Sequence, residues 1–299
     1  MCRLVAPEVT VEKCVGCGSC IAVCPDRTLS LVDGRAVISG EKCMQCGHCV
    51  AVCPEGALWL VTTEESLHCA TFHENLQWLP HGEADPVELV RLMRSRRSCR
   101  NYSVRPVKKE ILEDLVKIGT TAPSGTNSQA WTFTILPDRS KVTALGDLVA
   151  EFYRDLNQKA GNPFLRFVSR IFFQDALGRY YRRYYHSVAH GLQEWDEEGR
   201  DLLFHGATAA ILVGGSREAS CPAEDALLAT QSILLAAHAL GLGTCLIGFV
   251  VEAVKRDQRV RRFLSLQRGE SIYSAIALGY PAEEYVRVAG RKRIVPRIL

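Results

Sequence analysis

Short alternating runs of apolar and polar residues mark the first part of the chain. Leu29 to Ile38 alternates on either side of Asp33-Gly34, a pair typical of tight hairpin turns, and this predicts two short antiparallel strands. A second short apolar run, Ala57 to Val61, predicts another small strand nearby. Runs this short form small sheets rather than a large core, so we expect a small domain that ends near Thr63.

The pattern lengthens after a polar stretch. Residues 64–85 are mixed and polar, which predicts a linker that lies on both domains. Pro86 opens a helical pattern of apolar residues, and Thr132 to Leu136 reads as a strand. Ala223 to Leu240 is largely apolar but contains Glu224, Asp225, Gln231 and His238, so it predicts a buried helix rather than a membrane span. We therefore divide the chain into residues 1–63, 64–85 and 86–299.

Eight cysteines form two copies of one spacing, Cys-x2-Cys-x2-Cys-x3-Cys-Pro. Thiolates are soft ligands, and four of them directed into a small space can hold an iron-sulfur cube. In two-cluster ferredoxins, the first three cysteines of a run bind one cluster and the fourth binds the other. This spacing predicts two 4Fe-4S clusters, one held by Cys14, Cys17, Cys20 and Cys53 and the other by Cys43, Cys46, Cys49 and Cys24.

Two alternatives to the clusters are weaker. Zinc sites use two CxxC pairs for each ion and have no need of the prolines that end both runs. A disulfide scaffold requires an oxidising compartment, and Met1 to Lys13 lacks the apolar core of a signal peptide. We therefore expect a cytoplasmic protein.

Composition narrows the function only slightly. The chain has 299 residues, far more than a two-cluster domain needs, and its hydrophobic fraction of 47% can fill a second core. The net charge is +3, which is too small to indicate nucleic-acid binding. A membrane-surface role, the alternative that a basic aromatic segment would suggest, is not favoured.

Four separated stretches of the second domain carry polar or glycine-rich patterns. The first is rich in arginine, whose guanidinium group matches phosphate oxygens, although a solvated basic helix end has the same composition. The second could be only a tight loop, the third only a glycine helix cap, and the fourth only a basic tail. In order, the stretches are 95–102, 122–131, 241–248 and 290–293.

Taken together and in this order, the four stretches resemble those of the nitroreductase family of FMN-dependent flavoproteins, from about Asp85 to Leu299. The resemblance implies an α+β fold and a homodimer with two FMN molecules at its interface. It also implies an enzyme without a catalytic acid or base, because the flavin performs the chemistry.

The resemblance further implies roles for individual residues. The first stretch would bind the ribityl chain, the phosphate or the polar ring edge, and the basic tail would hold the phosphate. The second would contact the ring from the opposite subunit, and the third would pack along one flavin face. Many relatives carry an acidic residue where Ile247 stands, so its hydrogen bond to the flavin edge is absent here. The implied FMN ligands are Arg96, Arg97, Ser98, Arg100, Pro123, Ser124, Gly125, Asn127, Gln129, Cys245, Leu246, Ile247, Gly248, Arg291 and Arg293.

Clusters fused to a flavin domain imply a path for electrons. The first hypothesis is an oxidoreductase that passes electrons from two 4Fe-4S clusters to FMN and on to a small organic acceptor, such as a nitro compound, a quinone or an activated double bond. The second is an electron carrier that serves a protein partner or NAD(P)H, and the third is a redox sensor. An external ferredoxin, a flavodoxin or NAD(P)H could be the donor.

The segment 150–206 reads as an insertion between the flavin motifs. Many tyrosines and phenylalanines occur there among arginines. Two interpretations stay open: a lid over the substrate, or a pair of helices that wraps the partner subunit with arginines lying along apolar surface.

Overall fold

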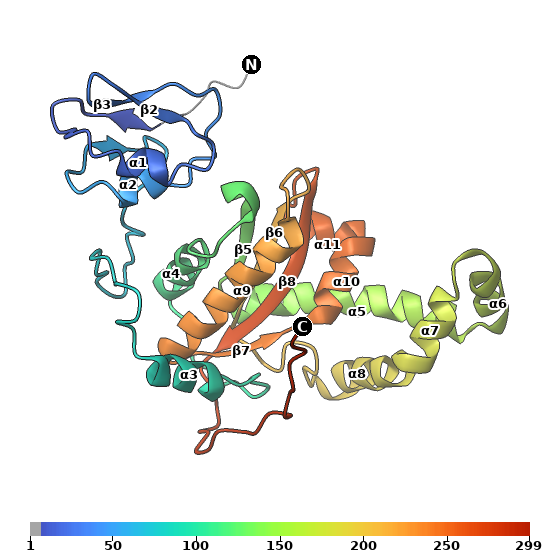
Figure 1. Ribbon diagram of the computed structural model, residues 1–299. Coiled ribbons are helices and arrows are strands. Elements are labelled where there is room, and N and C mark those ends of the chain that lie inside the picture. The colour runs from blue at the N-terminus through green and yellow to red at the C-terminus, as the bar shows by residue number, and fades with distance from the viewer. Residues whose placement is uncertain (1–6) are drawn as a thin grey trace.

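The computed structural model describes residues 7–299 and has an α+β architecture, as the resemblance implied (Figure 1). A small N-terminal domain lies at one end of the molecule. A long connection without helices or strands leads from it to a larger domain built on a four-stranded sheet. Among the described residues, no helix has both the length and the apolar character needed to cross a membrane.

The small domain consists of two two-stranded sheets and two one-turn helices. The predicted hairpin is confirmed: β2 (Leu29–Val32) and β3 (Arg35–Ile38) pair antiparallel around Asp33 and Gly34. The second apolar run supplies β4 (Leu58–Trp59), which pairs with β1 (Glu8–Val9). The helices α1 (Ser19–Ala22) and α2 (His48–Ala51) each follow a glycine in the left-handed region.

The large domain is built on an antiparallel sheet with the strand order β5-β6-β8-β7. The predicted strand after the second motif is confirmed as β5. The third motif, whose glycines could have been only a helix cap, forms the edge strand β7 beyond the left-handed Gly241. The strands are β5 (Trp131–Leu136), β6 (Ala209–Ser216), β7 (Gly243–Leu246) and β8 (Glu270–Gly279).

Helices cover both faces of this sheet. Along β6, Ile211 and Val213 face a core shared with α9, while Ala210 and Leu212 face a second core shared with α5 and α10. This two-residue alternation is what a strand buried on both sides requires. The helices that form these layers are α4 (Lys109–Gly119) and α9 (Pro222–Ala239) on one face, and α5 (Arg139–Gly161), α10 (Gly248–Arg256) and α11 (Gln258–Phe263) on the other.

The segment 150–206 begins inside α5, which continues without a break through residue 150. Beyond α5, three helices project from the body of the domain (Figure 1). They are α6 (Pro163–Phe172), α7 (Ala176–Arg183) and α8 (Tyr185–Glu198). The apolar face of α6 is largely exposed, and Phe164 and Phe172 are 69% and 72% exposed. The predicted Pro86 helix is confirmed as α3 (Pro86–Ser95).

The linker is fixed to the large domain by one buried carboxylate. Asp114 on α4 accepts hydrogen bonds from the backbone N–H of Ala70 at 2.9 Å and of Thr71 at 2.8 Å, and from the Thr71 hydroxyl at 2.6 Å. Burial by itself raises the pKa of Asp114, but these hydrogen bonds together hold that pKa below its ordinary value. The linker therefore has a defined attachment to α4.

We expect Asp114→Ala to lower the free energy of unfolding by about 3 kcal/mol, because it leaves several buried donors without an acceptor. Urea denaturation measures the change. Glu113→Ala is the control, since its half-exposed carboxylate makes only a surface pair with Lys109. Because the pKa of Asp114 is depressed in the folded state, its stabilisation is present at neutral pH and is lost as the pH falls below about 4. Equal losses from both variants would contradict the anchoring role.

Candidate functional site

The eight motif cysteines line two hollows in the small domain. Cys14, Cys17, Cys20 and Cys53 line one hollow. Cys24, Cys43, Cys46 and Cys49 line the other. This is the same grouping as the one stated from the spacing, and the ligand assignment stays a prediction. The grouping arises because the two halves of the domain pack together, so that the fourth cysteine of each run reaches across.

Backbone amides point at several of these sulfurs. The N–H of Ala57 donates to Cys53 Sγ at 3.2 Å, and that of Thr28 to Cys24 Sγ at 3.3 Å. Amide hydrogen bonds of this kind stabilise thiolates and tune iron-sulfur centres. Hydrogen bonds from the Ala36 and Gly16 backbone lower the pKa of Cys14, whereas burial raises the pKa of Cys20. The donor set and its amides fit an iron-sulfur cluster in each hollow.

No three His, Cys, Asp or Glu side chains within residues 7–299 lie in an arrangement suited to one metal ion. The cysteines of both hollows are free thiols, without disulfides between them. A cube spreads its four thiolate ligands over four irons, whereas a zinc ion gathers them around a single point.

The first and third motifs of the large domain lie side by side. Ser98 forms a parallel bridge with Thr244 of β7, and the N–H of Cys99 donates to the Thr244 carbonyl at 2.9 Å. The approach is so close that a Cβ on Gly243 would lie 2.7 Å from Cys99 Cβ, so only glycine fits there. The sheet edge thus places the arginines of 96–100 next to the residues of 245–248.

These arginines have no acidic partner among the described residues. Within the described chain, no carboxylate lies within 4.0 Å of the guanidinium groups of Arg96, Arg97 or Arg100. The pKa of Cys245 is raised by burial, and the positive charges of Arg100 and Arg96 partly oppose that rise. Unpaired guanidinium groups beside a strand that carries a glycine fit a phosphate-bearing ligand.

A hollow of about 830 Å³ opens beside β7 and extends under α7. Its walls include Arg100 and all four residues of 245–248, together with His205. Tyr180 of α7 and Tyr184, which follows that helix, also line the hollow, so the projecting helices do border this space. Burial lowers the pKa of His205 and favours its neutral form. The volume falls within the range of sites that hold cofactors and small ligands.

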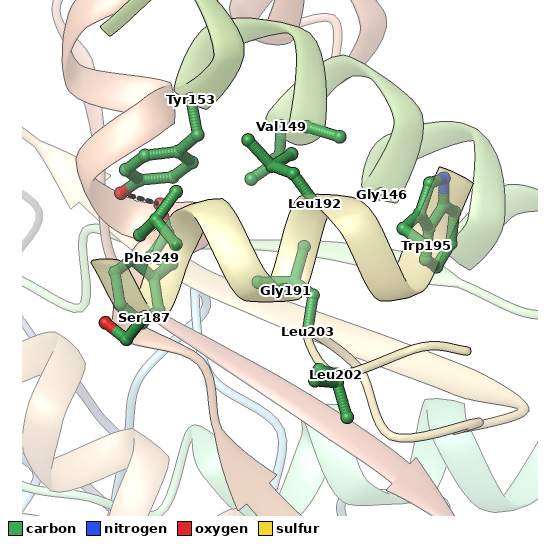
Figure 2. Close-up of a pocket in the computed structure, with 12 residues that line it drawn as sticks. Gly146, Val149, Tyr153, Ser187, Gly191, Leu192, Trp195, Leu202, Leu203 and Phe249 are labelled. Atoms are coloured by element: carbon green, nitrogen blue, oxygen red, sulfur yellow. Dashed lines mark hydrogen bonds between the residues drawn. The ribbon is translucent and has the colours of Figure 1, made fainter. Parts of the chain in front are cut away.

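A smaller apolar cavity of about 160 Å³ adjoins this hollow, between α5 and α8 (Figure 2). Tyr153 and Phe249 line both spaces, and the Tyr153 hydroxyl donates to the Phe249 carbonyl at 3.1 Å. Figure 2 shows Gly191 of α8 among the lining residues, and nothing lies within 4 Å of the position its Cβ would take.

We expect Gly191→Ala to raise the free energy of unfolding by about 0.5–1 kcal/mol, because alanine favours the helix and the added methyl group meets no atom. A thermal melt measures the gain. The contrasting variant is Gly178→Ala on α7, where the new Cβ would lie 2.1 Å from the Asp175 carboxylate and force it away from Arg182. A lower melting temperature for Gly191→Ala would contradict the open space.

The second motif forms a turn that is organised by Asp225. This nearly buried carboxylate on α9 accepts from the Gly125 N–H at 2.8 Å and from the Ser128 hydroxyl at 3.3 Å. A Cβ on Gly125 would lie 2.4 Å from Ser220 Oγ. Ser124 accepts from the Gln129 N–H, while Pro123 and Gln129 themselves are exposed. Sequence reasoning missed Asp225, whose helix position gave no signal of its role.

The two halves of the predicted FMN site lie at opposite ends of the sheet. Trp131, the last residue of the second motif, aligns through β6 with Ser271 of β8. Gly243, in the third motif, pairs with Gly279 of the same strand. Eight residues of strand separate these positions, which corresponds to about 26 Å. One chain therefore does not bring both halves together.

Three of the predicted ligands do not line the hollow beside β7. Asn127 donates its side-chain amide to the Met44 and Gln45 carbonyls in the small domain. Arg291 and Arg293 lie on an exposed C-terminal segment, and within residues 7–299 no hydrogen bond or ion pair joins either to the first motif. Their role in phosphate binding stays a prediction.

Comparison with known proteins gives matches for both domains. Residues 93–280 match the nitroreductase family, and residues 6–54 match the 4Fe-4S dicluster domain. The NADH dehydrogenase of Thermus thermophilus is 29% identical over 191 residues, which are 63% of this chain and 84% of that protein. The 4-nitrobenzoate reductase of Nocardioides sp. is 28% identical over 208 residues, which are 63% of this chain and 78% of that protein.

Solved structures show the same likeness. A nitroreductase with bound FMN from Desulfitobacterium hafniense DCB-2 aligns with 71% of this chain and 98% of its own, with a TM-score of 0.50 and 20% sequence identity. At that identity the likeness concerns the fold alone.

Proposed function

The chain belongs to the nitroreductase family and carries a 4Fe-4S dicluster domain, and we propose that it passes electrons from two 4Fe-4S clusters to FMN and on to a small organic acceptor. FMN, when bound, can take up electrons singly and deliver two, which lets one-electron clusters serve a two-electron reaction. The chain's own residues bind and orient the cofactor and the acceptor. No side chain is assigned as a general acid or base.

The observation that carries this proposal is the 830 Å³ hollow beside β7. Arg100 and the residues from Cys245 to Gly248 border this hollow. We propose that they hold the flavin, and that Arg96, Arg97 and Ser98 also contact it. Tyr180 and Tyr184 give the hollow an aromatic wall suited to a planar acceptor. The projecting helices thereby support the lid interpretation of 150–206.

We propose that the active unit is a homodimer. The arginine motif and the 123–129 turn lie at opposite ends of one sheet, so a site that uses both must take them from two chains. A twofold axis that brings the turn of one protomer against β7 of its partner would complete two such sites. We expect one FMN per chain, and we place the protein in a reducing cytoplasm, where its thiols stay available.

The test is an anaerobic reduction experiment on the full chain. A low-potential donor first reduces the clusters, and flavin bleaching is followed by absorbance. Nitroaromatics such as 4-nitrobenzoate, quinones and enones are then added as acceptors. Cys17→Ala, which removes one predicted ligand, is run alongside, and NAD(P)H is tested as a direct reductant.

The expected result is flavin bleaching that requires Cys17, followed by reoxidation with a small molecule. Absence of FMN from the purified protein would refute the proposal. Reduction by NAD(P)H that is equally fast in Cys17→Ala would instead favour an electron carrier in which the clusters are the exit. The same conclusion would follow if only a ferredoxin or flavodoxin reoxidised the flavin.

A further inference from the structure

The turn between Cys43 and Cys46 touches the 123–129 turn of the large domain. The Asn127 side-chain amide donates to the Gln45 carbonyl at 2.9 Å and to the Met44 carbonyl at 3.2 Å. In Figure 1 the chain just before β5 reaches toward the small domain at this point. Within residues 7–299, these are the only side-chain hydrogen bonds between residues 7–63 and the large domain.

One of these hydrogen bonds acts on a peptide group that also touches a cluster ligand. The peptide that joins Met44 to Gln45 receives the Asn127 amide at its oxygen, and its N–H donates to Cys43 Sγ at 3.4 Å. Donation to a peptide oxygen polarises the peptide and strengthens its N–H as a donor. Hydrogen bonds to cluster sulfurs stabilise the reduced, more negative cluster. Asn127 therefore acts on the electronics of one specific cluster.

Both partners of this contact are held in place. On the cluster side, the Met44 N–H donates to Asp26 at 2.8 Å, and the Gln45 side chain accepts from the Thr62 hydroxyl at 2.8 Å. On the other side, Asn127 has a φ of 53°, in the left-handed region that asparagine tolerates well. Its turn is fixed by the Gly125 N–H on the nearly buried Asp225. The contact is thus a connection between two ordered turns.

The other hollow has no such connection. Within the described chain, no hydrogen bond or ion pair joins Cys14, Cys17, Cys20 or Cys53 to the large domain, and Cys17 is exposed to solvent. An exposed ligand gives an external donor access to the edge of a cluster. The two clusters are therefore unequal, although their motifs are alike.

We propose that the cluster of Cys24, Cys43, Cys46 and Cys49 delivers electrons to the flavin, that the other cluster receives them from outside, and that Asn127 is the positioning residue for the delivery. This inference rests on the proposed function. Each step oxidises a reduced cluster by one electron and reduces the flavin by one, and the external low-potential donor supplies the electrons in turn. Because the 123–129 turn serves a flavin bound at the partner's arginines, delivery crosses from one protomer to its partner.

The test is an anaerobic redox titration of the full chain followed by electron paramagnetic resonance. Asn127→Gly removes both amide hydrogen bonds and tolerates the left-handed backbone at this position, and Thr126→Ala changes the same turn without touching the cluster domain. The two cluster signals are assigned with Cys46→Ser and Cys17→Ser. FMN content and the rate of flavin reduction by pre-reduced clusters are measured on the same samples.

In Asn127→Gly we expect the midpoint potential of the Cys46 cluster to fall and that of the Cys17 cluster to stay unchanged. We also expect flavin reduction per bound FMN to slow by about tenfold, the usual scale for loss of a supporting group at a metal centre. Thr126→Ala should change neither quantity. Unchanged potentials, or equal shifts of both clusters, would overturn the inference. The potentials do not depend on flavin turnover, so they decide this inference even if the proposed function fails.

Discussion

Two variants that each fail to bind FMN are expected to bind it again when they assemble with one another. One variant, Arg96→Glu/Arg100→Glu, reverses the charge of the arginine motif, and the other, Pro123→Trp, obstructs the turn. Because these halves lie about 26 Å apart along one chain, each site in the dimer takes one half from each protomer. A mixed dimer then has one site with both lesions and one with neither. Random co-assembly should restore about one quarter of wild-type FMN occupancy.

Flavin absorbance of the purified mixture, per chain, measures this recovery. All three substitutions change exposed or half-exposed side chains, so each variant is expected to fold, and circular dichroism checks that it does. The control is a chain that carries both lesions, mixed with itself. Flavin binding by either variant alone, or no recovery in a mixture shown to contain mixed dimers, would contradict a site shared between protomers.

The second large effect concerns the protomer whose clusters serve a given flavin. We call the chain with Arg96→Glu/Arg100→Glu the arginine variant and the chain with Pro123→Trp the turn variant. In the mixed dimer, the single intact site combines the unchanged turn of the arginine variant with the unchanged arginines of the turn variant. Cys46→Ser placed in the arginine variant is expected to slow cluster-driven flavin reduction by at least about a hundredfold, because it damages the cluster beside the working turn. The same substitution in the turn variant should leave that reduction unchanged.

Stopped-flow absorbance of the flavin, after rapid mixing with a low-potential donor, measures both cases. Cys69→Ser, a cysteine outside both motifs, is the matched control and should change neither rate. Cys46→Ser could instead slow flavin reduction equally in either protomer, or only when it is placed in the turn variant. Either result would show that electrons do not pass from the clusters of one protomer to the flavin site of its partner.

The local features of the chain could be predicted from the sequence with little error. The hairpin at Asp33-Gly34, the Pro86 helix and the strand before Leu136 follow from turn residues and periodicity, which act over a few residues. Strands β6 and β8 were not predicted, because a strand buried on both faces lacks the apolar and polar alternation that marks an exposed one. The third motif, which from the sequence could have been only a glycine helix cap, becomes β7 through pairing with β8, at least thirty residues away.

The sequence by itself determined the chemistry of this protein: eight thiols in a spacing that suits iron-sulfur clusters, and four motifs that indicate a flavin domain. These depend on residue type and short spacing, which are local properties. Only the tertiary structure decided which groups meet. It separated the arginine motif from the 123–129 turn, and it gave Asp225 and Asp114 their roles as anchors of backbone amides. It also joined Asn127 to the turn at Cys43. Such contacts join residues tens of positions apart, and they form only when the sheet, its helices and the linker pack together.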